Sequence, residues 1–170
     1  LTTFGKVIGG GLPIAAYGGR RDLMEQVAPA GPVYQAGTLS GNPLAVAAGR
    51  AALTELSKDG GAAYRRLETT GAAFEAGLRE TAARHGIPLR VYRQGSMVGL
   101  FFTDRPVRSS ADVDASDRGR FARVFHHLLD DGIHPPPSPY EAWFLSTAHG
   151  EEEIELALAA FDRAFRAEAA

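Results

Sequence analysis

Three consecutive glycines followed closely by a proline, at residues 9–13, constrain this chain more than any other feature of its sequence. Glycine weakens helices and strands alike, and proline lacks the amide hydrogen that either structure needs. The segment must therefore form a tight turn or a stretch of backbone that another group approaches closely. It lacks the spacing of a Walker loop or a dinucleotide-binding fingerprint, so we interpret it as a structural turn in preference to a phosphate-binding loop.

Lys6 precedes this run and is one of only two lysines in the chain. Its neighbours Val7 and Ile8 are apolar, and a poorly solvated ammonium gives up its proton more readily than one in water. A neutral amine condenses with carbonyl compounds, which is the chemistry of a Schiff-base lysine. The alternative is a surface lysine at the end of a strand, with its stem on apolar surface and its ammonium in water.

A second polar cluster ends in Asn42 and Pro43, followed by small and apolar residues at 44–56. Asparagine followed by proline predicts the N-cap and the first residue of a helix. Gly37 and Thr38 lie just before this helix start, where backbone N–H groups and a hydroxyl can hold an anion. Simple capping explains the same residues, and the spacing by itself favours capping.

Apolar periodicity beyond residue 56 predicts a second module. The predicted helices are residues 62–85, 121–131 and 151–166, and the predicted strands are residues 89–94, 97–103 and 143–148. We expect a hinge at residues 57–61 and a mobile polar loop at residues 105–117. Helices on a small, mostly antiparallel sheet form an α+β module. We therefore place one domain at residues 1–58 and a second at residues 59–170.

The composition excludes several classes of function. A net charge of −2 supplies no basic field for nucleic acid. The chain has no cysteine, which removes disulfides, thiolate catalysis and cysteine-ligated metal. His126, His127 and His149 lack the spacing with acidic residues that a metal site needs, so we predict no metal. No apolar run approaches the length of a membrane span and no signal peptide is visible, so we expect a cytoplasmic protein without a membrane partner.

The chain resembles a known family in five segments. They are residues 5–13, 18–22, 31–43, 121–132 and 141–149. In these segments it is similar to the C-terminal half of the glutamate-1-semialdehyde aminomutases, which belong to the class III aminotransferases and use pyridoxal phosphate. The resemblance implies an α/β fold, the C-terminal part of a fold-type I transferase. The first domain would end the large cofactor-binding domain, and the second would be the small α+β C-terminal domain.

The resemblance also implies an activity. It is an intramolecular amino transfer that converts glutamate-1-semialdehyde, (S)-4-amino-5-oxopentanoate, to 5-aminolevulinate on the way to tetrapyrroles. The implied cofactor is pyridoxal 5'-phosphate, which passes through the pyridoxamine form, and the implied assembly is a homodimer with shared active sites. Two alternatives stay open: another class III aminotransferase acting between an amino donor and a keto acid, and a non-catalytic dimerisation module.

Four residues carry roles that the resemblance implies. Lys6 matches the catalytic lysine that holds the cofactor covalently and then transfers protons. Gly37 and Thr38 match the contact to the cofactor phosphate of the neighbouring subunit. Glu141 matches a substrate-site glutamate of the aminomutases, where many relatives use an arginine for the substrate carboxylate. A carboxylate there disfavours a dicarboxylate amino donor.

Two departures from the family pattern lie beside Glu141. The family has an aromatic and aliphatic pair where this chain has His134 and three prolines, and a small residue where it has Trp143. The indole would either narrow the substrate pocket or fill a cavity. The resemblance begins at the first residues of the chain, so we expect the C-terminal fragment of an enzyme whose remaining part holds the cofactor ring.

Overall fold

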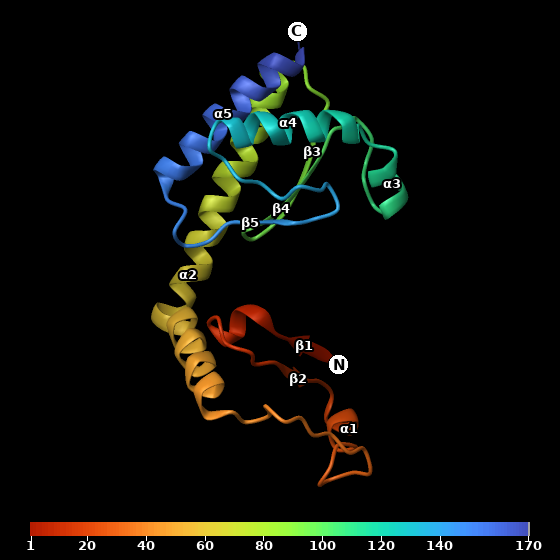
Figure 1. The fold of residues 1–170 in the computed structure, drawn as a ribbon, viewed down its shortest axis with the longest axis vertical. Helices are drawn as coiled ribbons and strands as arrows, with labels where there is room; N and C mark the ends of the chain where they lie inside the picture. Colours follow the sequence, from red (N-terminus) through yellow and green to blue (C-terminus); the bar gives the residue numbers. More distant parts are fainter. Residues whose placement is uncertain (170) are drawn as a thin grey trace. The chain divides into compact units, whose positions relative to one another are not determined.

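The computed structural model describes residues 1–169 and divides into two compact units (Figure 1). The first unit is Leu1–Ala62, and the second begins at Ala63. None of the helices within residues 1–169 combines the length and the apolar composition that a membrane span requires.

In the first unit, a short hairpin encloses the glycine-rich run. Strand β1 (Thr2–Phe4) pairs antiparallel with β2 (Ala16–Gly18), and the 3-10 helix η1 (Lys6–Gly9) lies between them. Gly10 and Gly11 follow η1 with φ of 57° and 94°, in the left-handed region that favours glycine. The turn predicted from the three glycines is therefore confirmed.

The long helix α2 (Pro43–Arg84) follows the short helix α1 (Arg21–Met24). Its predicted start is confirmed, because the Asn42 side-chain oxygen accepts a hydrogen bond from the Ala45 amide at 3.1 Å. The helical backbone is interrupted at residues 58–61, which separate a first segment (residues 43–57) from a second segment (residues 62–84). The predicted hinge at residues 57–61 overlaps this interruption, whereas the two compact units divide between residues 62 and 63, four residues beyond the predicted boundary.

The second unit is built on a three-stranded antiparallel sheet in the order β3 (Arg90–Gln94), β4 (Met97–Phe101), β5 (Trp143–Phe144). Residues that alternate along the strands are buried, so one face of the sheet packs on helices. These helices are the second segment of α2, α4 (Arg118–Asp130) and α5 (Glu151–Ala169).

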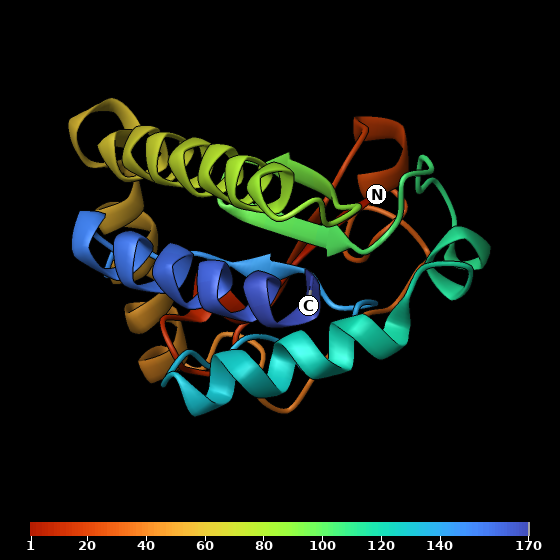
Figure 2. The ribbon, with the colours of Figure 1, turned by 90° about the horizontal axis from the view of Figure 1, so that it is seen from above.

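Helix α5 lies between the second segment of α2 and α4 (Figure 2). Ion pairs join it to both neighbours. Arg84 of α2 contacts Asp162 at 2.7 Å, and Arg123 of α4 contacts Glu168 at 2.8 Å. The carboxylate of Glu168 is nearly buried, and its hydrogen bond to Arg123 lowers its pKa from the ordinary value. These pairs link α5 to the helix on either side of it.

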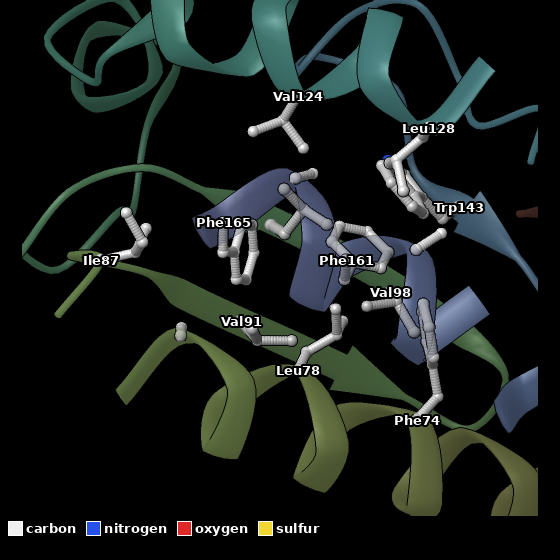
Figure 3. Close-up of a cluster of buried hydrophobic side chains, with 14 of the residues drawn as sticks. Phe74, Leu78, Ile87, Val91, Val98, Val124, Leu128, Trp143, Phe161 and Phe165 are labelled. Atoms are coloured by element: carbon white, nitrogen blue, oxygen red, sulfur yellow. The ribbon is translucent and has the colours of Figure 1, made fainter. Parts of the chain in front are cut away.

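Two aromatic residues of α5 form the centre of the core. Phe161 and Phe165 are fully buried, with ring centroids 5.4 Å apart in an edge-to-face arrangement. Figure 3 shows them between Val124 of α4 and Leu78 of α2. Because the three helices and the sheet all contribute side chains to this cluster, they share a single core in the second unit.

Two elements differ from the sequence-based expectation. The prediction of a loop at residues 105–117 is wrong in part, because this segment contains helix α3 (Ser110–Asp114). A capping box starts this helix: Ser109 accepts from the Asp112 amide, and the Asp112 carboxylate accepts from the Ser109 amide. The strand expected at residues 143–148 ends at Phe144, because the Ser146 amide turns to donate to His149 Nδ1 at 2.9 Å.

Gly71 in α2 marks a close approach between helix and sheet. A Cβ atom built there would lie 2.3 Å from the carbonyl oxygen of Gly95, in the turn between β3 and β4. We expect Gly71→Ala to lower the free energy of unfolding by about 1–3 kcal/mol, because backbone must move to admit the methyl group. Urea unfolding followed by the fluorescence of Trp143, the only tryptophan of the chain, measures the change.

Gly119 in α4 provides the matched control. The atoms nearest to a Cβ there are side-chain atoms at 3.4 Å, an ordinary contact distance. Gly119→Ala should therefore leave the free energy of unfolding unchanged or raise it by up to about 1 kcal/mol, because alanine is the better helix former. Equal effects of the two substitutions would show that the approach of Gly95 to α2 does not constrain residue 71.

Candidate active site

Lys6 is the first residue of η1 and has an unusual backbone conformation. Its φ of 55° lies in the left-handed region, which for a residue other than glycine costs about 1–3 kcal/mol. The side chain is exposed, and no residue among 1–169 forms a hydrogen bond or ion pair with its ammonium. The amine is therefore accessible to a carbonyl compound from solution.

The apolar surrounding expected for Lys6 is not formed by the described part of the chain, so that expectation is wrong for these residues. Val7 is 71% exposed, and Gly5 is exposed as well. Ile8 faces the first segment of α2 instead, where a Cβ atom on Gly49 would lie 3.0 Å from its carbonyl oxygen. Packing on α2 thus orders η1 without covering Lys6.

Ile8 also lines a groove of about 760 Å³ in the first unit. The groove runs along the first segment of α2, and its apolar lining includes Val46 and Leu53. Lys6 is not among the lining residues. The amine and the groove are therefore separate features of the first unit.

Gly37 and Thr38 lie in an exposed turn before α2. The Ser40 amide donates to the Gly37 carbonyl at 2.9 Å, and a Cβ atom on Gly37 would lie 3.0 Å from the Ser40 hydroxyl. Capping of α2 is performed by Asn42. Within residues 1–169 the Thr38 hydroxyl has no hydrogen-bond partner, so it can bind an external group, and its contact to a phosphate stays a prediction.

Glu141 lies in the second unit, in the segment between α4 and β5. Its amide donates to the Ser138 carbonyl at 3.1 Å, which closes a turn at residues 138–141. The side chain is exposed, and its carboxylate pairs with no other residue of the described chain. Of the four predicted site residues, Lys6, Gly37 and Thr38 thus belong to the first unit and Glu141 to the second.

Trp143, which departs from the family pattern, is a core residue. Its side chain is 8% exposed, and its ring lies 5.9 Å from that of Phe161. It also faces Val98, the residue paired with it across β4 and β5. Of the two roles left open by the sequence, the structure supports filling of the interior of the second unit.

Sequence reasoning did not single out a polar cluster next to Glu141. Tyr140, Asp114 and Arg118 contact one another, although they come from a loop and two helices. The sequence carries no signal for this cluster, because Tyr140 is separated from the other two by more than 20 residues. Groups of three or more metal-ligating side chains do not occur within residues 1–169.

Comparison with known proteins identifies relatives across the whole chain. The family model for class-III aminotransferases matches residues 1–138. A glutamate-1-semialdehyde 2,1-aminomutase of Thermus thermophilus is 58% identical over 164 residues, which are 96% of this chain and 38% of the relative. The protein of that name from Anaeromyxobacter dehalogenans is 54% identical over 100% of this chain and 39% of its own length. The chain thus spans about two fifths of the curated relatives it matches.

Solved structures give the same grouping. An omega-transaminase from Sphaerobacter thermophilus superposes with a TM-score of 0.81 at 32% identity, covering 96% of this chain and 37% of that one. A beta-phenylalanine aminotransferase from Variovorax paradoxus superposes with a TM-score of 0.79 at 36% identity, covering 95% of this chain and 37% of that one. A glutamate-1-semialdehyde aminomutase from Pseudomonas aeruginosa superposes with a TM-score of 0.80 at 26% identity, covering 95% of this chain and 38% of that one. The predicted α/β fold class, part of a fold-type I transferase, is confirmed by these matches.

Proposed function

The chain belongs to the class-III aminotransferase family, and from this premise we propose that the complete protein is a glutamate-1-semialdehyde 2,1-aminomutase. It would move the amino group within (S)-4-amino-5-oxopentanoate to give 5-aminolevulinate, a precursor of porphyrins. The observation that carries the proposal is the 54–58% identity to relatives of that name over nearly all of this chain. The omega-transaminase and the beta-phenylalanine aminotransferase of known structure are only 32% and 36% identical.

We propose pyridoxal 5'-phosphate, with its pyridoxamine form in the cycle, as the cofactor. Solved neighbours contain PLP or PMP. When bound, this cofactor supplies an electron sink for charge that develops on a substrate carbon. The exposed amine of Lys6 fits its carbonyl group, and a hydroxyl with free backbone amides at a helix start fits its phosphate. Lys6 would hold the cofactor covalently and, once released, move a proton on the substrate as acid and base.

Thr38, with Gly37, would contact the cofactor phosphate of a second subunit in a homodimer with shared active sites. Support comes from the surroundings of the turn. Tyr34 is 83% exposed and Leu39 is 58% exposed, and large apolar side chains of this kind are enriched at protein interfaces. We place the complete protein in the cytoplasm.

Glu141 would tune substrate choice. Its carboxylate is exposed and unpaired within the described chain, and the sequence holds no arginine between residues 134 and 149. A dicarboxylate amino donor would meet charge repulsion at this position instead of the bidentate pairing that an arginine offers. This suits an enzyme that needs no external amino donor.

A second candidate is a class III aminotransferase that moves an amino group between a donor and a keto acid. One observation favours it. The chain is 36% identical to the solved beta-phenylalanine aminotransferase and 26% identical to the solved aminomutase from Pseudomonas aeruginosa. Both candidates use the same chemistry at Lys6 and differ in whether the amino group leaves the substrate.

The test is turnover of glutamate-1-semialdehyde by the complete protein with no keto acid present. We expect 5-aminolevulinate to form at a rate that an added keto acid does not increase, because donor and acceptor carbons lie in one molecule. Absolute dependence on a keto acid would instead establish the second candidate. Failure to turn over the semialdehyde under either condition, with cofactor supplied, would overturn the aminomutase. A protein that then retained no cofactor would favour the dimerisation module, and one that retained it would favour an aminotransferase with another amino donor.

A further inference from the structure

Three polar side chains beside Glu141 contact one another in a closed triangle. Arg118, the first residue of α4, lies 3.3 Å from the carboxylate of Asp114 at the end of α3 and donates to the Tyr140 hydroxyl at 3.3 Å. The Tyr140 hydroxyl in turn donates to Asp114. Each side chain therefore touches the other two. We call these three residues the tyrosine clamp.

The clamp acts on a segment that has no regular secondary structure. Residues 134–142 lie outside helices and strands, so hydrogen bonds of a helix or sheet ladder do not hold them. A turn orders their end locally, because the Tyr140 amide donates to the Ser138 hydroxyl at 3.2 Å and the Glu141 amide to the Ser138 carbonyl at 3.1 Å. The clamp joins this turn to α3 and α4 through side-chain contacts.

Glu141 lies between two anchors. On one side Tyr140 is held by the clamp, and on the other Trp143 is buried in the core. The backbone of Glu141 is therefore fixed in both directions, while its carboxylate forms no hydrogen bond or ion pair within residues 1–169. A charged group that is carried on an ordered backbone and left unpaired is available for contact with a ligand.

The chemistry of the clamp favours orientation over stability. All three side chains are about half exposed or more, and exposed ion pairs contribute little to the free energy of unfolding. A hydrogen bond from a hydroxyl to a carboxylate nevertheless has a preferred direction, and it is stronger than a hydrogen bond between two neutral groups. The hydrogen bond to Asp114 also raises the pKa of Tyr140, so its hydroxyl keeps the proton it donates.

We propose that Asp114 and Arg118, acting through Tyr140, are positioning residues that set the place of the Glu141 carboxylate and thereby the discrimination between substrates. The proposal rests on the function proposed above, in which Glu141 faces the substrate. Lys6 performs its proton transfers in another unit of the chain. Loss of the clamp should consequently weaken substrate selection more than it slows the chemical steps.

The experiment compares Tyr140→Phe with the wild type in the complete protein loaded with pyridoxal phosphate. Phenylalanine keeps the ring and removes only the hydroxyl. We expect the KM for the semialdehyde to rise about fivefold, because Glu141 would lose its place beside the substrate, with kcat within about twofold. The rate with glutamate, a dicarboxylate amino donor, should rise relative to the wild type. Asp114→Asn retains an acceptor oxygen and should rescue KM in part, whereas Asp114→Ala should match Tyr140→Phe.

A double-mutant cycle separates positioning from a purely structural role. If Tyr140 acts through Glu141, Tyr140→Phe should leave KM unchanged when it is added to Glu141→Ala. Tyr64→Phe, which removes an exposed hydroxyl from α2, is the matched control and should change neither KM nor kcat.

The outcomes distinguish the two proposals. An active wild type whose KM is unaffected by Tyr140→Phe, or a KM effect that persists in the Glu141→Ala background, would overturn the positioning role and leave the proposed function standing. A wild type that does not turn over the semialdehyde would overturn the proposed function, and the role of the clamp with it.

Discussion

Replacing Lys6 by arginine in the complete protein should remove covalent attachment of pyridoxal phosphate and lower kcat by at least about 10²–10⁴-fold, the range contributed by one general acid–base group. Arginine keeps the positive charge and the length of the side chain. Its guanidinium stays protonated, however, and neither condenses with a carbonyl nor exchanges protons with substrate near neutral pH. The substitution therefore isolates the chemistry of the amine from its charge.

The chain offers one matched control, since Lys58 is its only other lysine. Lys58 is exposed and forms an ion pair with Glu55, so Lys58→Arg should preserve both the pair and the activity. Borohydride reduction followed by peptide mapping should find a pyridoxyl group on Lys6 in the wild type and in Lys58→Arg. A pyridoxyl group on Lys58, or full activity of Lys6→Arg, would refute the assignment of Lys6.

Replacing Phe161 by alanine should lower the free energy of unfolding of the second unit by about 3–5 kcal/mol. The ring is fully buried and contacts three other aromatic residues, with centroid distances of 6.1 Å to Phe74, 5.9 Å to Trp143 and 5.4 Å to Phe165. Alanine would leave a cavity among side chains from α2, α5 and β5. The substitution thus removes contacts with several secondary-structure elements at once.

Phe144 supplies the comparison, because it is also a phenylalanine and is 71% exposed. Phe144→Ala should change the free energy of unfolding by no more than about 0.5 kcal/mol. Urea titration of the 170-residue chain, followed by Trp143 fluorescence, reports on both variants because the indole adjoins Phe161. A loss below about 1 kcal/mol for Phe161→Ala would mean that the core repacks around the deleted ring.

The parts of the fold that sequence predicts well are those with local causes. Asn42 and Pro43 start α2 because capping depends on residues within one turn. The turn at the run of glycines is predicted for a similar reason, because it depends on the backbone freedom of the glycines themselves. Helix α3 has a capping box in Ser109 and Asp112, but its five residues are too few for apolar periodicity to appear, so the sequence pattern predicts a loop there.

The candidate site was predicted less completely, because its geometry depends on distant residues. The exposure of Lys6 is set by what packs on η1, and its own neighbours in sequence suggested burial. The tyrosine clamp joins Tyr140 to Asp114 across 26 positions, a contact that no spacing rule encodes. The core position of Trp143 depends likewise on Phe161. The assignments of Lys6, Gly37, Thr38 and Glu141 came from family resemblance, and they remain predictions.

At residue 6 the left-handed backbone conformation favours one kind of residue for stability, while the proposed reaction requires another. For a φ of 55° glycine is the residue that folding alone would select, and asparagine is the next best. Neither has an amine. A screen of this chain for thermal stability would therefore favour replacements at residue 6 that remove the proposed reaction, so stabilisation of the protein by design must leave this residue out.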